Sequence, residues 1–176
     1  MAYRNKTFIS FASEDIHYYR LMCAWRVNTK FEFDFYDAHD INVARDSSQA
    51  ATINRRLRER LVNTKQVIML IGDDTRRKAA NPNTFVYYEA RTILSLGLPI
   101  IFANVNRSRV SQTHRIPEIL LEPYTMSTSF GPYILRYALD NFPNDFAENQ
   151  RLSEINRKKK AYHYKESIYE SLGLNA

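Results

Sequence analysis

The chain has 176 residues, of which 44% are hydrophobic and 25% charged, and its formal net charge is +6 at pH 7. These values are ordinary for one globular domain, and a chain of this length buries about 70% of its unfolded surface, so it needs no disulfide or metal to fold. The single cysteine excludes an intrachain disulfide, and the polar start and the lack of a long apolar run lead us to expect no signal peptide, no membrane span and a cytoplasmic location.

The first predicted elements are a strand, a helix and a second strand. Residues 7–11 are a short β-rich run, and Ser13-Glu14-Asp15 then offers a helix start with acidic groups at the positive end of the helix dipole. Apolar residues recur at three- and four-residue steps, at Ile16, Tyr19, Cys23 and Val27. This spacing predicts an amphipathic helix with Cys23 in the core. Residues 31–35 alternate strictly, which predicts a strand with one buried face near a sheet edge.

The middle of the chain continues the alternation of helices and strands. A polar stretch at residues 36–48 precedes a helix whose apolar face lies within residues 50–61. Residues 67–71 form a continuous apolar run, as is typical of a central parallel strand buried on both faces. A helix from residue 84 to about residue 97 and a strand at residues 99–103 complete the pattern.

Four strands separated by helices predict an α/β fold, namely a flavodoxin-like parallel sheet of four to five strands with helices on both faces. After residue 104 the pattern blurs, although residues 132–142 look helical and a charged helix or helix pair is expected from about residue 144. We therefore expect one domain at residues 1–142, with a C-terminal helical extension at residues 143–176 that packs on the same domain.

Ligands of open parallel sheets bind beyond the carboxyl ends of the strands. The sequence has no GxGxxG or Walker motif and only four glycines, which disfavours a Rossmann dehydrogenase and a P-loop NTPase. A response-regulator receiver would need an acid at the end of its third strand, where Ile71 and Gly72 stand. The histidines lack metal-ligand spacing, so no metal site is expected.

The acid that carries most information is Glu89, which follows Phe85 by four residues and so shares a helix face with it. Near the carboxyl edge of a sheet, an aromatic ring beside a carboxylate suits a nucleoside, because the ring can stack on a base while the carboxylate holds ribose hydroxyls or a cationic sugar. A purely structural reading stays open, in which Glu89 favours the helix dipole and Phe85 belongs to the core.

Several short motifs follow one another in order over about residues 6–105. They are Phe-x-Ser-Phe at residues 8–11, Glu14-Asp15, a polar connection at residues 37–47, the strand at residues 67–71 with Gly72 and Thr75, and Phe85-x-x-Tyr88-Glu89. This succession resembles the TIR domain family, in particular the bacterial TIR-like proteins of Thoeris antiphage defence. In that family the connection is the BB loop and the last motif is usually Trp-x-x-x-Glu, so Phe85 is a departure.

The resemblance implies cleavage of the nicotinamide–ribose bond of NAD, with Glu89 as the catalytic carboxylate. NAD is then the substrate, and no cofactor or metal is required. The implied substrate contacts are Ser10, Phe11, Ser13, Asp37, Asp46 and Phe85. The resemblance also implies a homo-oligomer and a product derived from ADP-ribose, cyclic or conjugated, that activates a separate effector protein.

Two other functions stay open. A non-catalytic TIR module that acts through protein contacts is favoured by Phe85 in place of tryptophan, and a nucleoside deoxyribosyltransferase-like enzyme would use a covalent glutamate on a similar sheet. The positive net charge and the mixture of residues 158–160 with Tyr162 and Tyr164 resemble some nucleic-acid binders. We interpret that segment as a charged surface helix instead, and expect neither a nucleic acid nor a membrane as partner.

Overall fold

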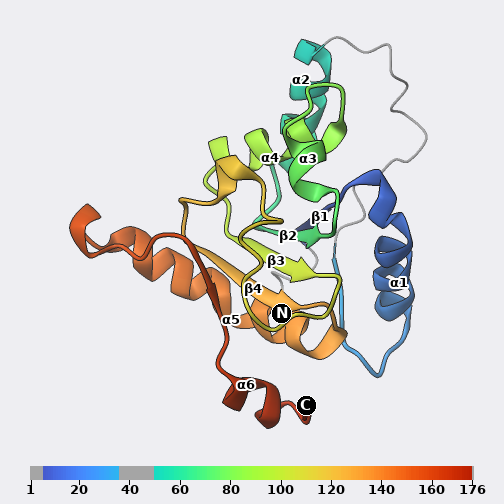
Figure 1. Cartoon of the computed structure of the whole chain (residues 1–176), viewed down its shortest axis with the longest axis vertical. Coiled ribbons are helices and arrows are strands. Elements are labelled where there is room, and N and C mark those ends of the chain that lie inside the picture. The colour runs from blue at the N-terminus through green and yellow to red at the C-terminus, as the bar shows by residue number, and fades with distance from the viewer. Residues whose placement is uncertain (1–5, 36–49, 176) are drawn as a thin grey trace.

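The computed structural model describes residues 6–35 and 50–175. These residues form one parallel sheet of five strands in the order β1-β2-β3-β4-β5, with helices on both faces (Figure 1). The strands are β1 Thr7–Ser10, β2 Gln66–Ile71, β3 Ile100–Asn104, β4 Thr125–Ser129 and β5 Ala161–His163. The helices are α1 Ile16–Val27, α2 Ala50–Leu61, α3 Thr75–Ala79, α4 Phe85–Ser95, α5 Pro132–Arg151 and α6 Glu166–Ser171. Short 3-10 helices lie at Ser13–Asp15, Glu118–Leu120 and Glu154–Asn156. The predicted α/β parallel sheet is confirmed.

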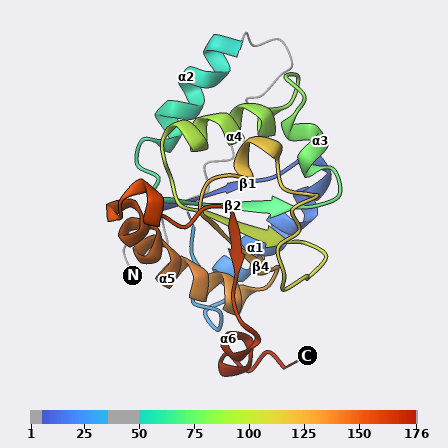
Figure 2. The same cartoon turned by 60° about the vertical axis from the view of Figure 1, so that its left-hand side comes forward.

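Two hydrophobic cores lie on the two faces of the sheet, and β2 contributes to both. Ile68 and Leu70 pack in the core that α1 and α5 cover, whereas Val67, Met69 and Ile71 pack in the core that α2 and α4 cover. Figure 2 shows α2 and α4 on one side of the sheet and α1 and α5 on the other. The continuous apolar run at residues 67–71 is therefore explained by burial on both faces.

The strand predicted at residues 31–35 is wrong. This segment leaves α1 and lies outside the hydrogen-bonded sheet, although Phe33 and Phe35 are each only 2% exposed. Glu32 has a φ of 45°, which interrupts an extended conformation. Side chains bond the backbone here, because Arg26 donates to the carbonyl of Phe35 and Arg136 donates to the carbonyl of Phe31. The alternation of residues 31–35 therefore reflects the burial of the aromatic side chains on one side of the segment, and the segment does not pair with a strand of the sheet.

The charged helix expected from residue 144 is also only partly present. Helix α5 contains 20 residues, runs through Pro143 and ends at Arg151. The chain then forms a 3-10 helix, strand β5 and α6, so residues 158–160 lie in the approach to a strand and the charged-helix interpretation of them is wrong. The expected boundary between residues 142 and 143 falls inside α5, and the C-terminal segment adds β5 to the sheet beside β4.

Helix α4 and strand β3 follow the predicted ranges closely. Gly97 lies just beyond the C-cap of α4 with a φ of 61°, the left-handed conformation in which glycine commonly ends a helix. The loop expected at residues 72–83 contains the short helix α3, whose start is held by a bond from the Gly72 N–H to Thr75 Oγ1 of 2.9 Å. None of the helices in the described ranges is long and apolar enough to cross a bilayer.

Candidate functional site

The end of β1 and the second turn of α4 meet through a pair of polar side chains. Ser10 Oγ donates a hydrogen bond of 2.6 Å to Glu89 Oε2, across a separation of 79 residues. Ser10 is 0% exposed and Glu89 5% exposed, so the bond lies in a nearly dry environment. Ser10 is the last residue of β1, which places the pair at the carboxyl edge of the sheet, where ligands of such sheets bind.

Glu89 occupies a helix position that packing would give to an apolar residue. The buried side of α4 carries Val86, Glu89, Ala90 and Ile93, at the three- and four-residue steps of a core-facing stripe. A buried carboxyl group is costly unless it is hydrogen-bonded, and the other buried residues of α4 are the apolar Val86, Ala90 and Ile93 and the uncharged Thr92, so the packing of this helix needs no charge. This placement is the pattern that a functional acid shows.

Thr84 fixes where α4 begins. Its hydroxyl accepts a bond of 3.4 Å from the Tyr87 N–H, in the manner of an N-cap, and donates one of 2.6 Å to the carbonyl of Lys78. The first turn of α4 is thereby tied to the end of α3, so the position of Glu89 one turn further along is well defined.

Phe85 is the first residue of α4 and is 39% exposed. The reading in which this ring belongs to the core therefore does not hold. A half-exposed ring one turn before a buried carboxylate is available to stack on a planar ligand group.

The other predicted contacts are distributed around the same edge. Phe11 is half-buried and its ring stacks on Tyr19, with centroids 4.8 Å apart and an interplanar angle of 21°. Ser13 is exposed and donates a bond of 3.1 Å to Glu14, which pairs with Lys78 at 2.8 Å. The bond from Lys78 lowers the pKa of Glu14 below its usual range. Asp37 and Asp46 lie outside the described residues.

The side chains of Phe11 and Ser10 point to opposite faces of the sheet. Side chains alternate along a strand, and Phe11 packs against the core that α1 covers whereas Ser10 bonds to α4. The structure therefore brings together Ser10 and Glu89 from the predicted set, with Phe85 one turn away on α4, and places Phe11 and Ser13 just beyond the end of β1.

A cavity of about 350 Å³ opens at the carboxyl ends of β1, β2 and β3. The residues that line it are Glu14, Asp15, His17, Tyr18, Asp73, Asp74, Val105, Asn106 and Arg115. Three of its acids have cationic partners, since Glu14 pairs with Lys78, Asp73 with Arg115 and Asp74 with Arg77. Glu89 and Phe85 are not among its lining residues.

Asp15 also lines this cavity, although the sequence patterns gave it only a place at the start of a helix. It is 7% exposed, and its Oδ2 has no hydrogen-bond partner within the described part of the chain. Burial raises the pKa of Asp15 from 3.8 to about 6; among its charged neighbours, His17 lowers the pKa, whereas Glu14, Asp74 and Asp73 raise it. The sequence feature that could have pointed to its burial is Gly72. A Cβ atom at that position would lie 2.3 Å from Asp15 Oδ2, so a larger residue there would clash with the carboxyl group.

The described residues include no group of three or more histidine, cysteine or acidic side chains that could hold a metal ion. Cys23, on α1, forms no disulfide and is half-buried against the core on that face of the sheet. Among the described residues, the carboxyl edge of the sheet presents carboxylates, hydroxyls and aromatic rings, together with the cations Lys78 and Arg115.

A five-stranded parallel sheet with helices on both faces, and a buried acid on α4, the helix that precedes β3, defines a flavodoxin-like protein of TIR-like architecture. Comparison with known families gives the particular family. The family described as the TIR-like domain of the Thoeris protein ThsB matches residues 8–109, and the chain belongs to it. The protein is thus a TIR-like protein of antiphage defence. The match spans β1 to β3 and includes Ser10 and Glu89. No curated protein matches the chain.

Proposed function

We propose that the protein consumes NAD, cleaving its nicotinamide–ribose bond with Glu89 as the catalytic carboxylate. The observation that carries the proposal is the buried Glu89 carboxyl group, held by Ser10 at the carboxyl edge of the sheet and inside the region that matches the family. Family membership supports the proposal further, because NAD cleavage is the chemistry that the resemblance to TIR domains implies.

The chemistry fits the residues present. Nicotinamide in NAD is already a cationic leaving group, so it departs as a neutral molecule without a general acid. The ribose then develops oxocarbenium character, as sugars do during glycoside hydrolysis. One preorganised carboxylate in a nearly dry site stabilises this charge strongly and can hold ribose hydroxyls, so neither a second acid nor a metal is needed.

Ser10 acts as a positioning residue in this scheme. Its hydroxyl fixes the rotamer of Glu89, so the charge is in place before the transition state forms. The half-exposed ring of Phe85 offers the surface on which a planar group of NAD stacks. Phe11, Ser13, Asp37 and Asp46 remain proposed substrate contacts.

The proposal extends to the product and the assembly. The ADP-ribosyl group left as nicotinamide departs would be captured at its anomeric carbon by a nucleophile of the same molecule, which gives a cyclic product, or by a separate acceptor, and a nucleophile that carries a proton releases it to solvent. The resulting nucleotide would activate a separate effector protein. A homo-oligomer is the proposed active form, and NAD is the small molecule that the reaction requires, as substrate.

Replacing Glu89 with glutamine tests the catalytic role. Glu89→Gln keeps the shape and removes the charge, so we expect about a hundredfold loss of nicotinamide release from NAD with an unchanged circular dichroism spectrum. Glu148→Gln makes the same chemical change at an exposed position of α5 and serves as the matched control. The assay uses purified protein and, in parallel, NAD levels in phage-infected cells. Equal nicotinamide release by wild type and Glu89→Gln would contradict the assignment.

A non-catalytic interaction module is the second candidate function. The 5% exposure of Glu89 favours it, because a nearly inaccessible carboxyl group bonded to Ser10 is also what a purely structural link between β1 and α4 requires. The same experiment separates the two functions. If infected cells that carry the wild-type protein keep their NAD while defence persists, the protein is a non-catalytic interaction module and the role of Glu89 is structural.

A further inference from the structure

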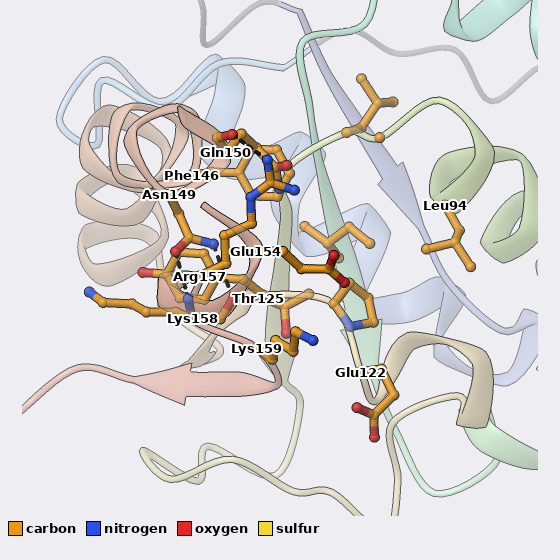
Figure 3. Close-up of a pocket in the computed structure, with 15 residues that line it drawn as sticks. Leu94, Glu122, Thr125, Phe146, Asn149, Gln150, Glu154, Arg157, Lys158 and Lys159 are labelled. Carbon is orange, nitrogen blue, oxygen red and sulfur yellow. Dashed lines mark hydrogen bonds between the residues drawn. The ribbon is translucent and has the colours of Figure 1, made fainter. Parts of the chain in front are cut away.

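A second cavity of about 350 Å³ lies at the amino edge of the sheet, opposite the edge where β1 ends (Figure 3). It is bordered by the first residues of β3 and β4, by the ends of α4 and α5, and by the segment that leads to β5. Its apolar wall consists of Leu94, Leu98, Ile100, Pro123 and Phe146. Figure 3 shows Leu94 and Phe146 on two sides of the cavity, with the Glu154 side chain between them.

Exposed apolar side chains gather around this cavity. In the part of the chain that the structure describes, eleven large hydrophobic side chains are exposed. Leu94 lines the cavity, and four others follow or precede a lining residue in sequence or contact one, namely Leu96, Leu152, Ile155 and Tyr162. An exposed apolar cluster with a polar rim is typical of a surface that another protein covers. These five side chains and the cavity are called the amino-edge patch below.

Ile155 is the protruding member of the amino-edge patch. It is 92% exposed, at the centre of the 3-10 helix Glu154–Asn156 that follows α5. Glu154 and Arg157, on either side of it in sequence, both line the cavity, so Ile155 stands at the rim. The same surface therefore carries an apolar protrusion and a cavity with an apolar wall.

The turn that carries Ile155 is held against the end of α5. The Arg157 guanidinium donates bonds of 2.8 and 2.9 Å to the carbonyls of Gln150 and Leu152. Asn149, itself 4% exposed, accepts a bond of 2.7 Å from the Lys158 N–H and donates one of 3.0 Å to the Lys158 carbonyl. Because the turn is fixed in this way, little conformational entropy is lost when a partner covers it.

The rim of the cavity carries both signs of charge. Glu122, Glu154 and Lys159 line the cavity, and all three residues are exposed. Within the described ranges, none of the three forms a salt bridge. The neighbouring Lys158 has another role, because its Nζ lies 5.6 Å from the centroid of the Tyr124 ring and Figure 3 shows its side chain directed away from the cavity.

These features fit a second copy of the same chain. In an interface with two-fold symmetry the same surface contributes from both chains, so a protrusion beside a cavity fills the cavity of the other copy and receives its protrusion. The charges fit as well, since Lys159 of each copy meets Glu122 or Glu154 of the other. A partner of one sign of charge would face like charge at some part of this rim.

We propose that the amino-edge patch is the contact surface of a two-fold symmetric dimer of this chain. Ile155 of each copy enters the cavity of the other between Leu94 and Phe146, and Leu152 packs on its rim. The proposal rests on the homo-oligomer of the proposed function and assigns a surface to it. Because the patch lies at the amino edge, both carboxyl-edge sites stay open to solvent in the dimer.

Sedimentation equilibrium of the full chain without NAD tests the dimer. We expect a monomer–dimer equilibrium with a Kd of about 1–100 μM, as small interfaces give. Ile155→Asp should raise this Kd about tenfold or more, because it brings a charge into an apolar cavity. Val110→Asp makes the same kind of change at an exposed position of the loop after β3 and should leave the Kd unchanged.

A disulfide experiment tests which side chains meet. Two variants, Ile155→Cys and Leu94→Cys, each also carrying Cys23→Ala and differing in mass by a tag, are mixed and oxidised. Each chain then contains one cysteine, so any disulfide joins two molecules. We expect a mixed disulfide between these variants, and none when Val110→Cys replaces Ile155→Cys.

Three results would overturn the proposal. They are a chain that stays monomeric up to about 1 mM, an equal rise of the Kd in Ile155→Asp and Val110→Asp, and the absence of the mixed disulfide from a chain that dimerises. Because Ile155 is exposed, its substitution does not threaten the fold, and an unchanged circular dichroism spectrum verifies this.

The dimer and NAD cleavage fail separately. Glu89→Gln should dimerise with the Kd of the wild type, and a loss of dimer in that variant would place the contact surface at the carboxyl edge and overturn the proposal. A wild-type dimer that releases no nicotinamide supports the surface and contradicts NAD cleavage. A monomer that releases nicotinamide overturns the surface alone.

Discussion

The buried carboxyl group of Asp15 couples the stability of the fold to pH. Its pKa is about 6 in the folded protein, above its ordinary 3.8, so between these values the folded state binds more protons than the unfolded state. Stability therefore falls as pH rises through this interval, and the full cost of ionising Asp15 is present above about pH 6. Below about pH 4 both states are protonated and the cost disappears.

Replacing Asp15 with asparagine should remove this cost. We expect Asp15→Asn to stabilise the protein by about 2–3 kcal/mol at about pH 7.5 and to have little effect at about pH 4. Urea denaturation of both proteins at the two pH values measures the difference. A gain of equal size at both pH values would show that ionisation of Asp15 is not its origin.

Single residues also show how much of the site can be predicted from the sequence. Ser10 and Glu89 stood at recognisable motif positions, so both could be proposed from sequence. The bond between them could not, because it joins residues 79 positions apart and depends on how α4 packs on β1. The sequence around Asp15 predicts only the start of a helix. Its burial depends on the loop after β2, which packs against it and is distant in sequence, so no local pattern predicts this contact.

Elements differ in how plainly the sequence encodes them. Strands β2 and β3 were predictable from their continuous apolar runs, and helix α4 from the three- and four-residue spacing of its apolar residues. Strand β4 reads Thr-Met-Ser-Thr-Ser, and its small polar side chains give no hydrophobic signal although most of them are buried. Conversely, residues 31–35 show perfect alternation and form no strand, because aromatic packing alone accounts for it. Periodicity records burial, whereas pairing of strands depends on distant partners.

The C-terminal helix α6 is anchored by one side chain. Tyr169 is 0% exposed, its hydroxyl accepts a bond of 3.0 Å from the Ser129 N–H at the end of β4, and Arg109 lies over its ring at 4.5 Å. Arg109 also pairs with Glu166 and donates to the carbonyl of Leu174. These contacts bind the last helix to the loop after β3.

Truncating this anchor should release the helix. Tyr169→Ala is expected to lower the free energy of unfolding by about 3–5 kcal/mol, because a large buried ring is lost, and to open the segment before α6 to limited proteolysis. Tyr162→Ala, at a 44% exposed position of β5, should cost only about 1 kcal/mol. Similar losses for the two variants would mean that Tyr169 is no special anchor.

At the scale of the whole molecule, the region that matches the family contains only part of the hydrophobic core. Residues 8–109 supply β1 to β3, whereas β4 and α5 supply much of the core on the α1 face. The residues that complete that core are Tyr124, Met126, Phe130, Leu135, Ala138, Leu139 and Phe142. Without them, one face of β3 and the inner face of α1 would be open to water, and β3 would become an unpaired edge.

A chain that ends at residue 109 should therefore fail to fold, although it contains Ser10, Glu89 and the whole region that matches the family. We expect it to aggregate or to show no cooperative thermal unfolding by circular dichroism. A chain that ends at residue 151 keeps β4 and α5, and should fold with reduced stability because it lacks β5 and the Tyr169 anchor. Cooperative unfolding of the 109-residue chain would show that the matched region forms a core by itself, and that folding does not require the elements after residue 109.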